Sequence, residues 1–245
     1  MRVVTSHRSL AFRAFLAAKK DKGMMLLEGR RLVENALSRG LVPGLAAVTP
    51  EYIRAHGPSR FPHTVLKEEL LARIADTRTP QGILAFFPVP WAAAEDLAGR
   101  ERIVILDGLQ DPGNVGTIIR TAEAFGFDAI ALTEGSASPF SPKAVRSSMG
   151  SVLGLTIARV QPEELATYPH RIITLAPRGS ARLSADLFRS PCAVCLGQEG
   201  AGVSPEMLAI SHETVSIPMK KNVESLNVAV TAGIVLACAG GVLPG

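Results

Sequence analysis

Short, almost continuously apolar segments recur through the second half of the chain. The strands expected from them are residues 103–106, 129–132, 156–160, 171–175, 193–196 and 214–217. Helices are expected between them, at residues 117–125 and 143–153 and from near Pro162, Ser204 and Asn227. Strands without polar alternation, separated by helices, are typical of an α/β fold with a parallel sheet covered on both faces. Ligands bind such sheets at the carboxyl ends of the strands, so the loops after residues 106, 196 and 217 are the candidate sites.

The first part of the chain predicts a smaller α/β unit. Its expected helices are residues 9–20, 30–39 and 67–74, and its expected strands are residues 24–27, 45–48, 65–66 and 82–87. Pro88, Pro90 and the small polar residues up to Arg102 then interrupt the pattern, as linkers often do. We therefore predict two domains, residues 1–95 and residues 96–245.

The composition excludes several classes of protein. A chain of 245 residues with 47% hydrophobic and 20% charged residues is too apolar for an intrinsically disordered protein and can bury a core without disulfides. Three cysteines suit the reducing cytoplasm, and no apolar run of the kind found in a secretory signal follows the N-terminal arginines. The uncharged stretch 228–243 contains glycines and is shorter than the about 20 residues of a spanning helix. We expect a buried C-terminal helix there and no membrane association.

Basic residues are concentrated at the start of the chain, whose net charge is +4. Residues 1–31 contain only two acidic residues, Asp21 and Glu28. The same segment contains eight basic residues: Arg2, Arg8, Arg13, Lys19, Lys20, Lys22, Arg30 and Arg31. Such a segment attracts polyanions through phosphate contacts, although a solvated face without a partner has the same pattern. Because aromatic residues make up only 5%, contacts with a nucleic acid backbone are expected to outweigh base stacking.

The loop at residues 107–116 is rich in glycine and leads into the expected helix that carries Arg120. Its glycine spacing fits neither a P-loop nor a dinucleotide-binding loop. Asn114 is either a simple helix cap or a site residue. Arg120 is either a surface charge or a planar fork for a phosphate group.

Two later loops repeat this mixture of glycines and polar residues. Residues 196–205 place Glu199 among three glycines at the end of an expected strand, which suits a plain turn as well as a binding loop. In residues 217–227, Ser225 and Asn227 are candidate N-caps of the last helix. Capping alone does not explain why so many polar residues precede an apolar helix, so they are also candidates for the wall of a pocket.

No metal site is predicted. Cys192 and Cys195 form a C-x-x-C pattern, but it lies in an expected strand, where the two side chains would point to opposite faces. The five histidines do not have the spacing of metal ligands.

Taken together, the three loops resemble the three sequence motifs of the SpoU (TrmH) family of RNA 2′-O-ribose methyltransferases, a part of the SPOUT superfamily. The residues that carry the likeness are Asn114, Gly116 and Arg120, then Gly197, Glu199, Gly200 and Gly202, then Ile217, Pro218, Met219, Ser225, Leu226, Asn227 and Val228. Their order and separation also match, and the likeness covers roughly residues 101–240. The first part of the chain is similar to the small α/β/α substrate-binding domain of many members.

The resemblance implies a methyltransferase domain with a deep trefoil knot, a homodimer, and S-adenosylmethionine as the cofactor. It implies transfer of a methyl group to a ribose 2′-hydroxyl, with ribosomal RNA as the expected substrate. The alternatives are a transfer RNA methyltransferase and a non-catalytic RNA-binding factor for ribosome assembly on the same fold. A nicotinamide-dependent dehydrogenase is disfavoured because the G-x-G-x-x-G pattern is missing.

The resemblance also implies roles for individual residues. The residues expected to bind the cofactor are Leu175, Ala176, Leu196, Gly197, Gly200, Ile217, Met219, Ser225 and Leu226. The residues expected to act in catalysis or to shape the site are Asn114, Arg120, Glu199, Ser225 and Asn227.

The interpretation that we favour for Arg120 is a clamp on the target phosphate that also stabilises negative charge on the 2′-oxygen, since arginine rarely loses its proton. Asn114 would orient Arg120 or the ribose, and Glu199 would shape the cofactor loop or order Arg120. Ser225 and Asn227 would hold their loop through hydrogen bonds. Further candidates for RNA contact are Lys143, Arg146, Lys220 and Lys221.

Overall fold

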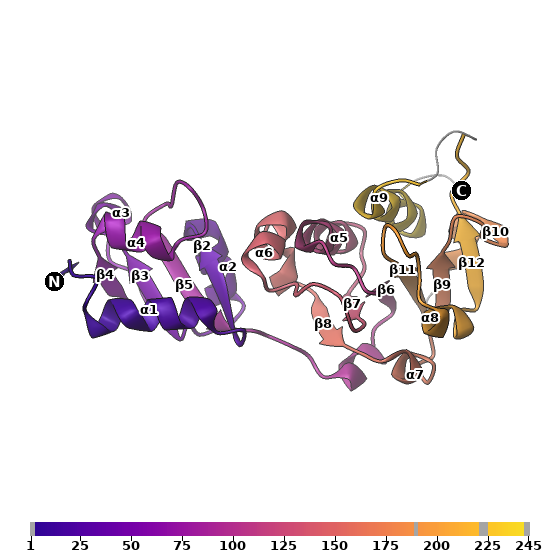
Figure 1. Cartoon of the computed structure of the whole chain (residues 1–245), viewed down its shortest axis with the longest axis horizontal. Coiled ribbons are helices and arrows are strands. Elements are labelled where there is room, and N and C mark those ends of the chain that lie inside the picture. Colours follow the sequence, from indigo (N-terminus) through magenta and orange to yellow (C-terminus); the bar gives the residue numbers. More distant parts are fainter. Residues whose placement is uncertain (1–2, 189–190, 221–224, 243–245) are drawn as a thin grey trace. The chain divides into compact units, whose positions relative to one another are not determined.

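The computed structural model describes residues 3–188, 191–220 and 225–242. The chain divides into two compact units, whose border in the sequence falls between Val89 and Pro90 (Figure 1). The predicted border lies a few residues later. The segment between the two borders packs on the second unit, where the Ala92 amide donates to the Ile157 carbonyl at 2.9 Å and the Tyr168 hydroxyl donates to the Ala94 carbonyl at 2.7 Å.

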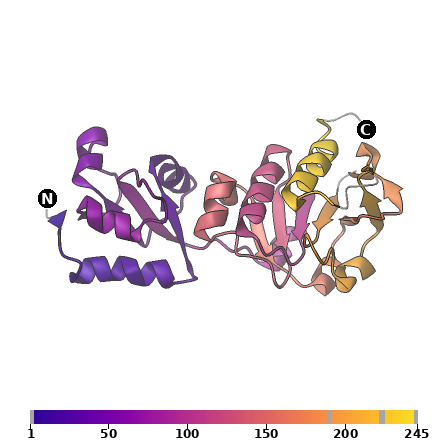
Figure 2. The ribbon, with the colours of Figure 1, turned by 45° about the horizontal axis from the view of Figure 1, so that its top comes forward.

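The first unit is a mixed five-stranded sheet with helices on both faces. Its strands are β1 (Val3–Val4), β2 (Met24–Glu28), β3 (Leu45–Val48), β4 (Thr64–Leu66) and β5 (Ile83–Pro88). Its helices are α1 (Leu10–Lys20), α2 (Arg30–Ser38), α3 (Pro50–His56) and α4 (Glu68–Ile74). The strand order is β1-β4-β3-β5-β2, and β5 runs antiparallel to both of its neighbours. Figure 2 shows the helices of this unit, in indigo to purple, packed around its sheet. The expected small α/β unit is therefore present.

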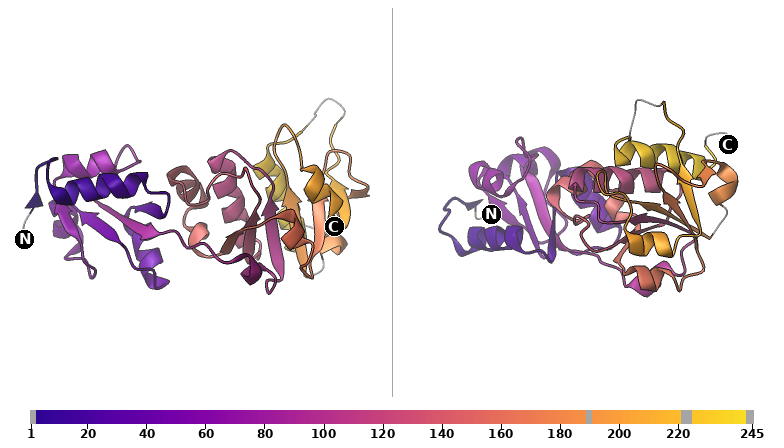
Figure 3. Two further views of the ribbon diagram at one scale, coloured as in Figure 1. Left: turned by 60° about the horizontal axis from the view of Figure 1, so that its bottom comes forward. Right: turned by 45° about the vertical axis from the view of Figure 1, so that its right-hand side comes forward.

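The helices of the first unit separate the basic N-terminal segment into two parts. Phe12 and Phe15 of α1 pack in one cluster with residues of α4 and of the sheet. In Figure 3, α1 is the indigo helix that runs along the sheet of this unit. Successive residues of a strand point to opposite faces, and α2 packs on β2 and β5 through Val33 and Ala36 from the other face. Basic residues of the N-terminal segment therefore lie on two different helices, α1 and α2.

The second unit is built on a sheet of seven parallel strands, which confirms the predicted fold class. Its strands are β6 (Arg102–Leu106), β7 (Ala129–Leu132), β8 (Thr156–Arg159), β9 (Arg171–Leu175), β10 (Ala181–Arg182), β11 (Cys192–Leu196) and β12 (Glu213–Ser216). Its helices are α5 (Pro112–Ala124), α6 (Pro142–Ser148), α7 (Pro162–Leu165), α8 (Pro205–Ala209) and α9 (Val228–Ala239), with short 3-10 turns η1 (Ala94–Leu97), η2 (Ser151–Leu153) and η3 (Ala185–Phe188). The strand order is β10-β12-β9-β11-β6-β7-β8. In Figure 1, α5, α6 and α9 cover one face of this sheet, and α7 and α8 cover the other.

Three sequence predictions for individual elements were wrong. The helix expected at residues 143–153 ends at Ser148, because Met149 has a φ of 53° and Gly150 a φ of 97°, which a right-handed helix does not allow. The helix expected from residue 117 begins at Pro112, where Asp111 accepts hydrogen bonds from the Gly113 and Asn114 amides. Helix α3, which was not predicted, begins after a Thr49 cap with Pro50 at its first position.

The C-terminal apolar stretch forms α9, the buried helix that was expected. Its 12 residues pack against α5, and Val235, Leu236 and Ala237 are buried. None of the helices in the described part of the chain has the length and apolar character needed to span a bilayer. The trefoil knot implied by the family likeness stays a prediction.

Candidate active site

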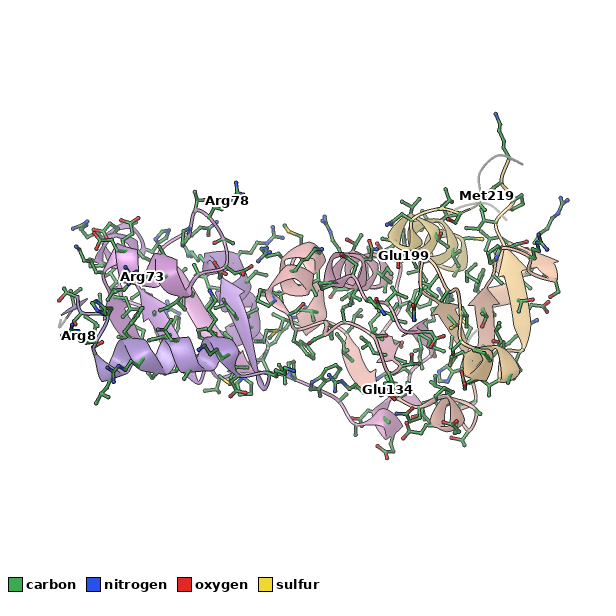
Figure 4. The ribbon with its side chains drawn as sticks, in the orientation of Figure 1. Arg8, Arg73, Arg78, Glu134, Glu199 and Met219 are labelled. Atoms are coloured by element: carbon green, nitrogen blue, oxygen red, sulfur yellow. The ribbon has the colours of Figure 1, made fainter. Side chains whose placement is uncertain are left out.

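A cavity of about 290 Å³ lies at the carboxyl ends of β9, β11 and β12, beside the start of α9. The residues that line it are Leu175, Ala176, Pro177, Leu196, Gly197, Gln198, Glu199, Gly200, Ala201, Gly202, Val215, Ile217, Met219, Ser225, Leu226, Val228 and Thr231. Parallel strands bring their carboxyl ends to one edge, which explains why loops far apart in sequence meet here. Figure 4 labels Glu199 and Met219 at this end of the unit.

All nine residues that were expected to bind the cofactor line this one cavity. Two further lining residues, Gly202 and Val228, had been named as motif residues but not as cofactor-binding residues. Sequence reasoning missed five others: Pro177, Gln198, Ala201, Val215 and Thr231. Most of these are direct neighbours of motif residues, and that proximity was the available signal. Thr231 is different, because it lies one helical turn after Asn227 on α9 and only the helical geometry brings it to the wall.

The loop at residues 197–204 is folded tightly on itself. The Gln198 amide donates to the Gly202 carbonyl at 2.9 Å, and the Gly202 amide donates back to the Gln198 carbonyl at 3.0 Å. A Cβ placed on Gly197 would lie 2.3 Å from the Gly202 oxygen, so this contact requires glycine. The loop therefore holds a fixed turn against the cavity.

Three polar side chains join the three motif loops. The Asn114 amide Nδ2 donates to Glu199 Oε1, and the Asn227 amide Nδ2 donates to Asn114 Oδ1 at 3.3 Å. Asn227 Oδ1 also accepts from the Ala229 and Val230 amides, which makes it the N-cap of α9. The cap interpretation is therefore right for Asn227 and wrong for Asn114, because Asp111 caps α5 and accepts from the Asn114 amide. Both asparagines belong to a network that reaches Glu199.

Arg120 and Ser225 stand outside this network. Arg120 is exposed on α5, six residues after Asn114, and makes no hydrogen bond or ion pair with any described residue. Neither Asn114 nor Glu199 makes a hydrogen bond or ion pair with Arg120 in the described part of the chain, so their expected role in ordering Arg120 stays a prediction. Ser225 lines the cavity, but its side chain makes no hydrogen bond within the described ranges. The structure therefore leaves the Arg120 guanidinium available for an external partner.

The lysines expected to contact RNA differ in their surroundings. Lys143 Nζ lies 2.7 Å from Asp111 Oδ2, so this cation is paired within the chain. The hydrogen bond from Lys143, with those from the Asn114 and Gly113 amides, lowers the pKa of the Asp111 carboxyl from its ordinary value. Lys220 is exposed, and Lys221 lies outside the described residues.

All three cysteines are free and buried, Cys192 and Cys195 in β11 and Cys238 in α9. Burial raises the pKa of the Cys192 and Cys195 thiols, and the nearby Asp107 raises that of Cys195 further. Among the described residues, no three histidine, cysteine, aspartate or glutamate side chains gather as a metal site would require.

Two parts of the chain match the models of known protein families. Residues 101–237 match the model of the SpoU rRNA Methylase family, and residues 13–85 match the MRM3-like substrate binding domain. The chain is 33% identical over 229 residues to the 23S rRNA (guanosine(2553)-2′-O)-methyltransferase RlmP of Bacillus subtilis, covering 90% of this chain and 91% of that protein. It is 26% identical to the human mitochondrial rRNA methyltransferase 3, covering 89% of this chain and 67% of the relative.

Solved structures agree over the whole chain. The rRNA methyltransferase of Sinorhizobium meliloti with bound AdoMet has a TM-score of 0.86 and 26% identity, covering 100% of this chain and 99% of that one. The SpoU methyltransferase AviRb of Streptomyces viridochromogenes, in complex with AdoMet, has a TM-score of 0.80 and 25% identity, covering 95% of this chain and 98% of that one.

The chain belongs to the SpoU rRNA methylase family. The expected enzyme class, an RNA methyltransferase that uses S-adenosylmethionine, is thereby confirmed.

Proposed function

We propose that the protein transfers a methyl group from S-adenosylmethionine to a ribose 2′-hydroxyl of large-subunit ribosomal RNA. The observation that carries this proposal is that the second and third motif loops line one cavity, while Asn114 of the first loop is hydrogen-bonded to Glu199 and Asn227. The Bacillus subtilis relative is named as a 23S rRNA 2′-O-methyltransferase. That name supports large-subunit ribosomal RNA as the substrate and the ribose 2′-oxygen as the atom that is methylated. The cytoplasm as the place of action and the homodimer as the working form belong to the same proposal.

The cavity fits the cofactor in size and lining. Leu175, Ile217 and Leu226 give it apolar walls that suit an adenine ring and a thioalkyl chain. A Cβ placed on Gly200 meets nothing within 4 Å, so the backbone faces open space there and a ligand can approach it closely. S-adenosylmethionine, when bound, supplies a methyl group on a sulfonium sulfur, a good leaving group for in-line transfer to an oxygen nucleophile.

In this proposal, Arg120 acts on the RNA. Its exposed guanidinium has no partner among the described residues and presents a planar fork that matches a phosphate group. The same charge stabilises the negative charge that develops on the 2′-oxygen as its proton leaves. Arginine is an unsuitable proton acceptor because a guanidinium keeps its proton in proteins. We therefore assign Arg120 to clamping the phosphate and stabilising charge.

In this proposal, the three motif loops are held at fixed positions around the reacting atoms by the hydrogen bonds among Asn114, Glu199 and Asn227. Each of the three comes from a different motif loop, so their hydrogen bonds fix the cofactor loop against the start of α5 and the cap of α9. Alignment of a methyl donor and an acceptor within a few tenths of an ångström is a large part of such catalysis. Ser225 and Met219 complete the wall on the side of α9.

The network predicts a selective effect of Asn227→Asp. Aspartate caps a helix as well as asparagine does, so the free energy of unfolding should change by less than about 1 kcal/mol. The substitution removes the Nδ2 donor and turns a second acceptor toward Asn114 Oδ1, so the rate of methyl transfer should fall about tenfold. Thermal unfolding and a single-turnover assay measure the two effects. A wild-type rate in the variant would show that this hydrogen bond has no part in the reaction.

The first unit, in this proposal, binds the RNA substrate. Its match to a substrate binding domain supports that role. Arg8, Arg73 and Arg78 are exposed and project from this unit in Figure 4. Contacts with phosphates by such residues position an RNA without reading its sequence.

The test of the function is methyl transfer to defined RNAs. Labelled S-adenosylmethionine and the purified chain are incubated with large-subunit rRNA, small-subunit rRNA or transfer RNA from cells that lack the gene, and the nucleosides are analysed. Label in a 2′-O-methylated nucleoside of large-subunit rRNA is the expected result. Label in transfer RNA, or on a base, would overturn the proposal. Cofactor binding without label on free rRNA or on precursor particles would point to the non-catalytic assembly factor.

A further inference from the structure

Asp107 is a buried carboxylate that the reaction described above does not use. It directly follows β6, and only 6% of the residue is exposed to solvent. Its backbone amide donates to the Leu196 carbonyl at 2.9 Å, so it sits beside the end of β11, where the cofactor loop begins. Burying a carboxylate is unfavourable unless hydrogen bonds compensate for the lost water.

The two carboxylate oxygens bind two different segments. Oδ1 accepts from the Thr133 hydroxyl at 2.7 Å, and Oδ2 accepts from the Ser204 backbone amide at 2.6 Å. The Thr133 oxygen accepts in turn from the Gly108 amide at 3.1 Å. One side chain therefore links the end of β6, the end of β7 and the residue at which α8 is capped.

These bonds fix the far end of the loop at residues 197–204. Its near end follows β11 directly, and the paired Gln198 and Gly202 close its base. Ser204 is the point where the loop enters α8, so the bond from its amide to Asp107 fixes where the loop stops. Glu199, Gly200 and Ala201 lie between these fixed points and line the cavity.

The first motif loop also packs against this segment. A Cβ placed on Gly108 would lie 2.5 Å from Gln198 Nε2, so the Gln198 side chain packs directly on this glycine. Gly108 has a φ of 66°, a conformation that favours glycine, and its amide is held by Thr133. The hydrogen-bonded pair of Asp107 and Thr133 therefore fixes the position of two loops beside the cavity, residues 107–116 and residues 197–204.

We infer that Asp107 is a positioning residue for the cofactor: with Thr133, it holds the loop at residues 197–204 in the shape that binds S-adenosylmethionine. This inference rests on the proposed function, because it takes the cavity to be the cofactor site. Asp107 touches neither the cofactor nor the RNA in this account and acts only through the Ser204 and Gly108 amides.

The experiment compares Asp107→Asn with a matched control, Asp128→Asn, at an aspartate that directly precedes β7 and binds the opposite end of β6. Asp128 accepts hydrogen bonds from the Glu101 and Arg102 amides, both at 3.1 Å, at the amino end of β6. Both substitutions replace one carboxylate oxygen with an amide donor, but only Asp107 is connected to the cofactor loop. Binding of S-adenosylhomocysteine to the full chain is measured by calorimetry, and methyl transfer is measured at saturating S-adenosylmethionine.

We expect Asp107→Asn to weaken binding of S-adenosylhomocysteine about tenfold, because the amide cannot satisfy the Ser204 amide and the Thr133 hydroxyl together. The kcat at saturating cofactor should fall less than threefold, since a saturating ligand restores the loop. Asp128→Asn should leave the affinity unchanged even where it lowers the melting temperature. An unchanged affinity in Asp107→Asn, or an equal loss in Asp128→Asn, would overturn the inference.

Two further variants decide the matter if Asp107→Asn does not fold. Thr133→Val removes the hydroxyl and should weaken S-adenosylhomocysteine binding, whereas Thr133→Ser keeps the donor and should bind as the wild type does. Equal affinities of these two variants would overturn the inference. The proposed function fails separately, because a wild-type chain that does not bind S-adenosylhomocysteine contradicts the cofactor site itself.

Discussion

Arg120→Ala is expected to lower the rate of methyl transfer about 100-fold to 1000-fold, the cost of removing one charged group that stabilises a transition state. The side chain is exposed and free of partners among the described residues, so its loss should leave the fold intact. It does not line the cavity, so the affinity for S-adenosylmethionine should be unchanged. A filter assay with labelled cofactor measures the rate, and calorimetry measures the affinity.

Two companion variants make this prediction specific. Arg120→Lys keeps the charge but not the planar fork, so it should remain at least about tenfold slower than the wild type. Arg171→Ala removes an arginine that pairs with Glu213 at 3.3 Å, at the opposite end of the sheet, and should retain wild-type activity. Full activity in Arg120→Lys would reject the clamp. A loss of cofactor affinity in Arg120→Ala would show that Arg120 acts on the cofactor and not on the RNA.

Gly197→Ala is expected to weaken cofactor binding about 100-fold. The added Cβ would lie 2.3 Å from the oxygen and 2.4 Å from the carbon of the Gly202 carbonyl group, and these backbone atoms cannot rotate away. The loop would have to open, and a displacement of about 1 Å at such a site costs on the order of 100-fold. Equilibrium binding of S-adenosylhomocysteine gives the result directly.

Gly99→Ala is the matched control for this substitution. A Cβ placed on Gly99 meets nothing within 4 Å, and its backbone is not in the left-handed region. The variant should therefore bind the cofactor as the wild type does. Wild-type affinity in Gly197→Ala would contradict the tight turn on which the description of the cavity depends.

The parallel sheet could be predicted from the sequence because its strands are short, apolar and separated by helices. Residues 193–196, for example, read as a strand buried on both faces, and β11 lies in the interior of the sheet. The ends of helices were harder to predict. Met149 ends α6 through a left-handed backbone that is uncommon outside glycine, and nothing in its own identity indicates this. For α5, the Asp111-Pro112 pair was a readable start signal.

The sequence indicated many of the residues around the cavity but not the hydrogen bonds between them. The family likeness indicated Asn114, Glu199 and Asn227, yet their mutual hydrogen bonds join residues 85 and 113 positions apart. Spacing along a chain gives no account of such pairs, because they depend on how the strands are ordered in the sheet. Asp107 and Ser204 illustrate the same limit, since their bond crosses 97 positions.

The measurement that tests the central claim most directly is a map of ribose methylation across ribosomal RNA from cells with and without the gene. A 2′-O-methyl group protects the adjacent phosphodiester from alkaline cleavage, so each methylated ribose is visible as a protected position. We predict that a large-subunit position is protected in cells with the wild-type gene, unprotected in cells without it, and unprotected in cells that carry only Arg120→Ala. Identical protection of all ribosomal RNA positions in the three strains would contradict the account.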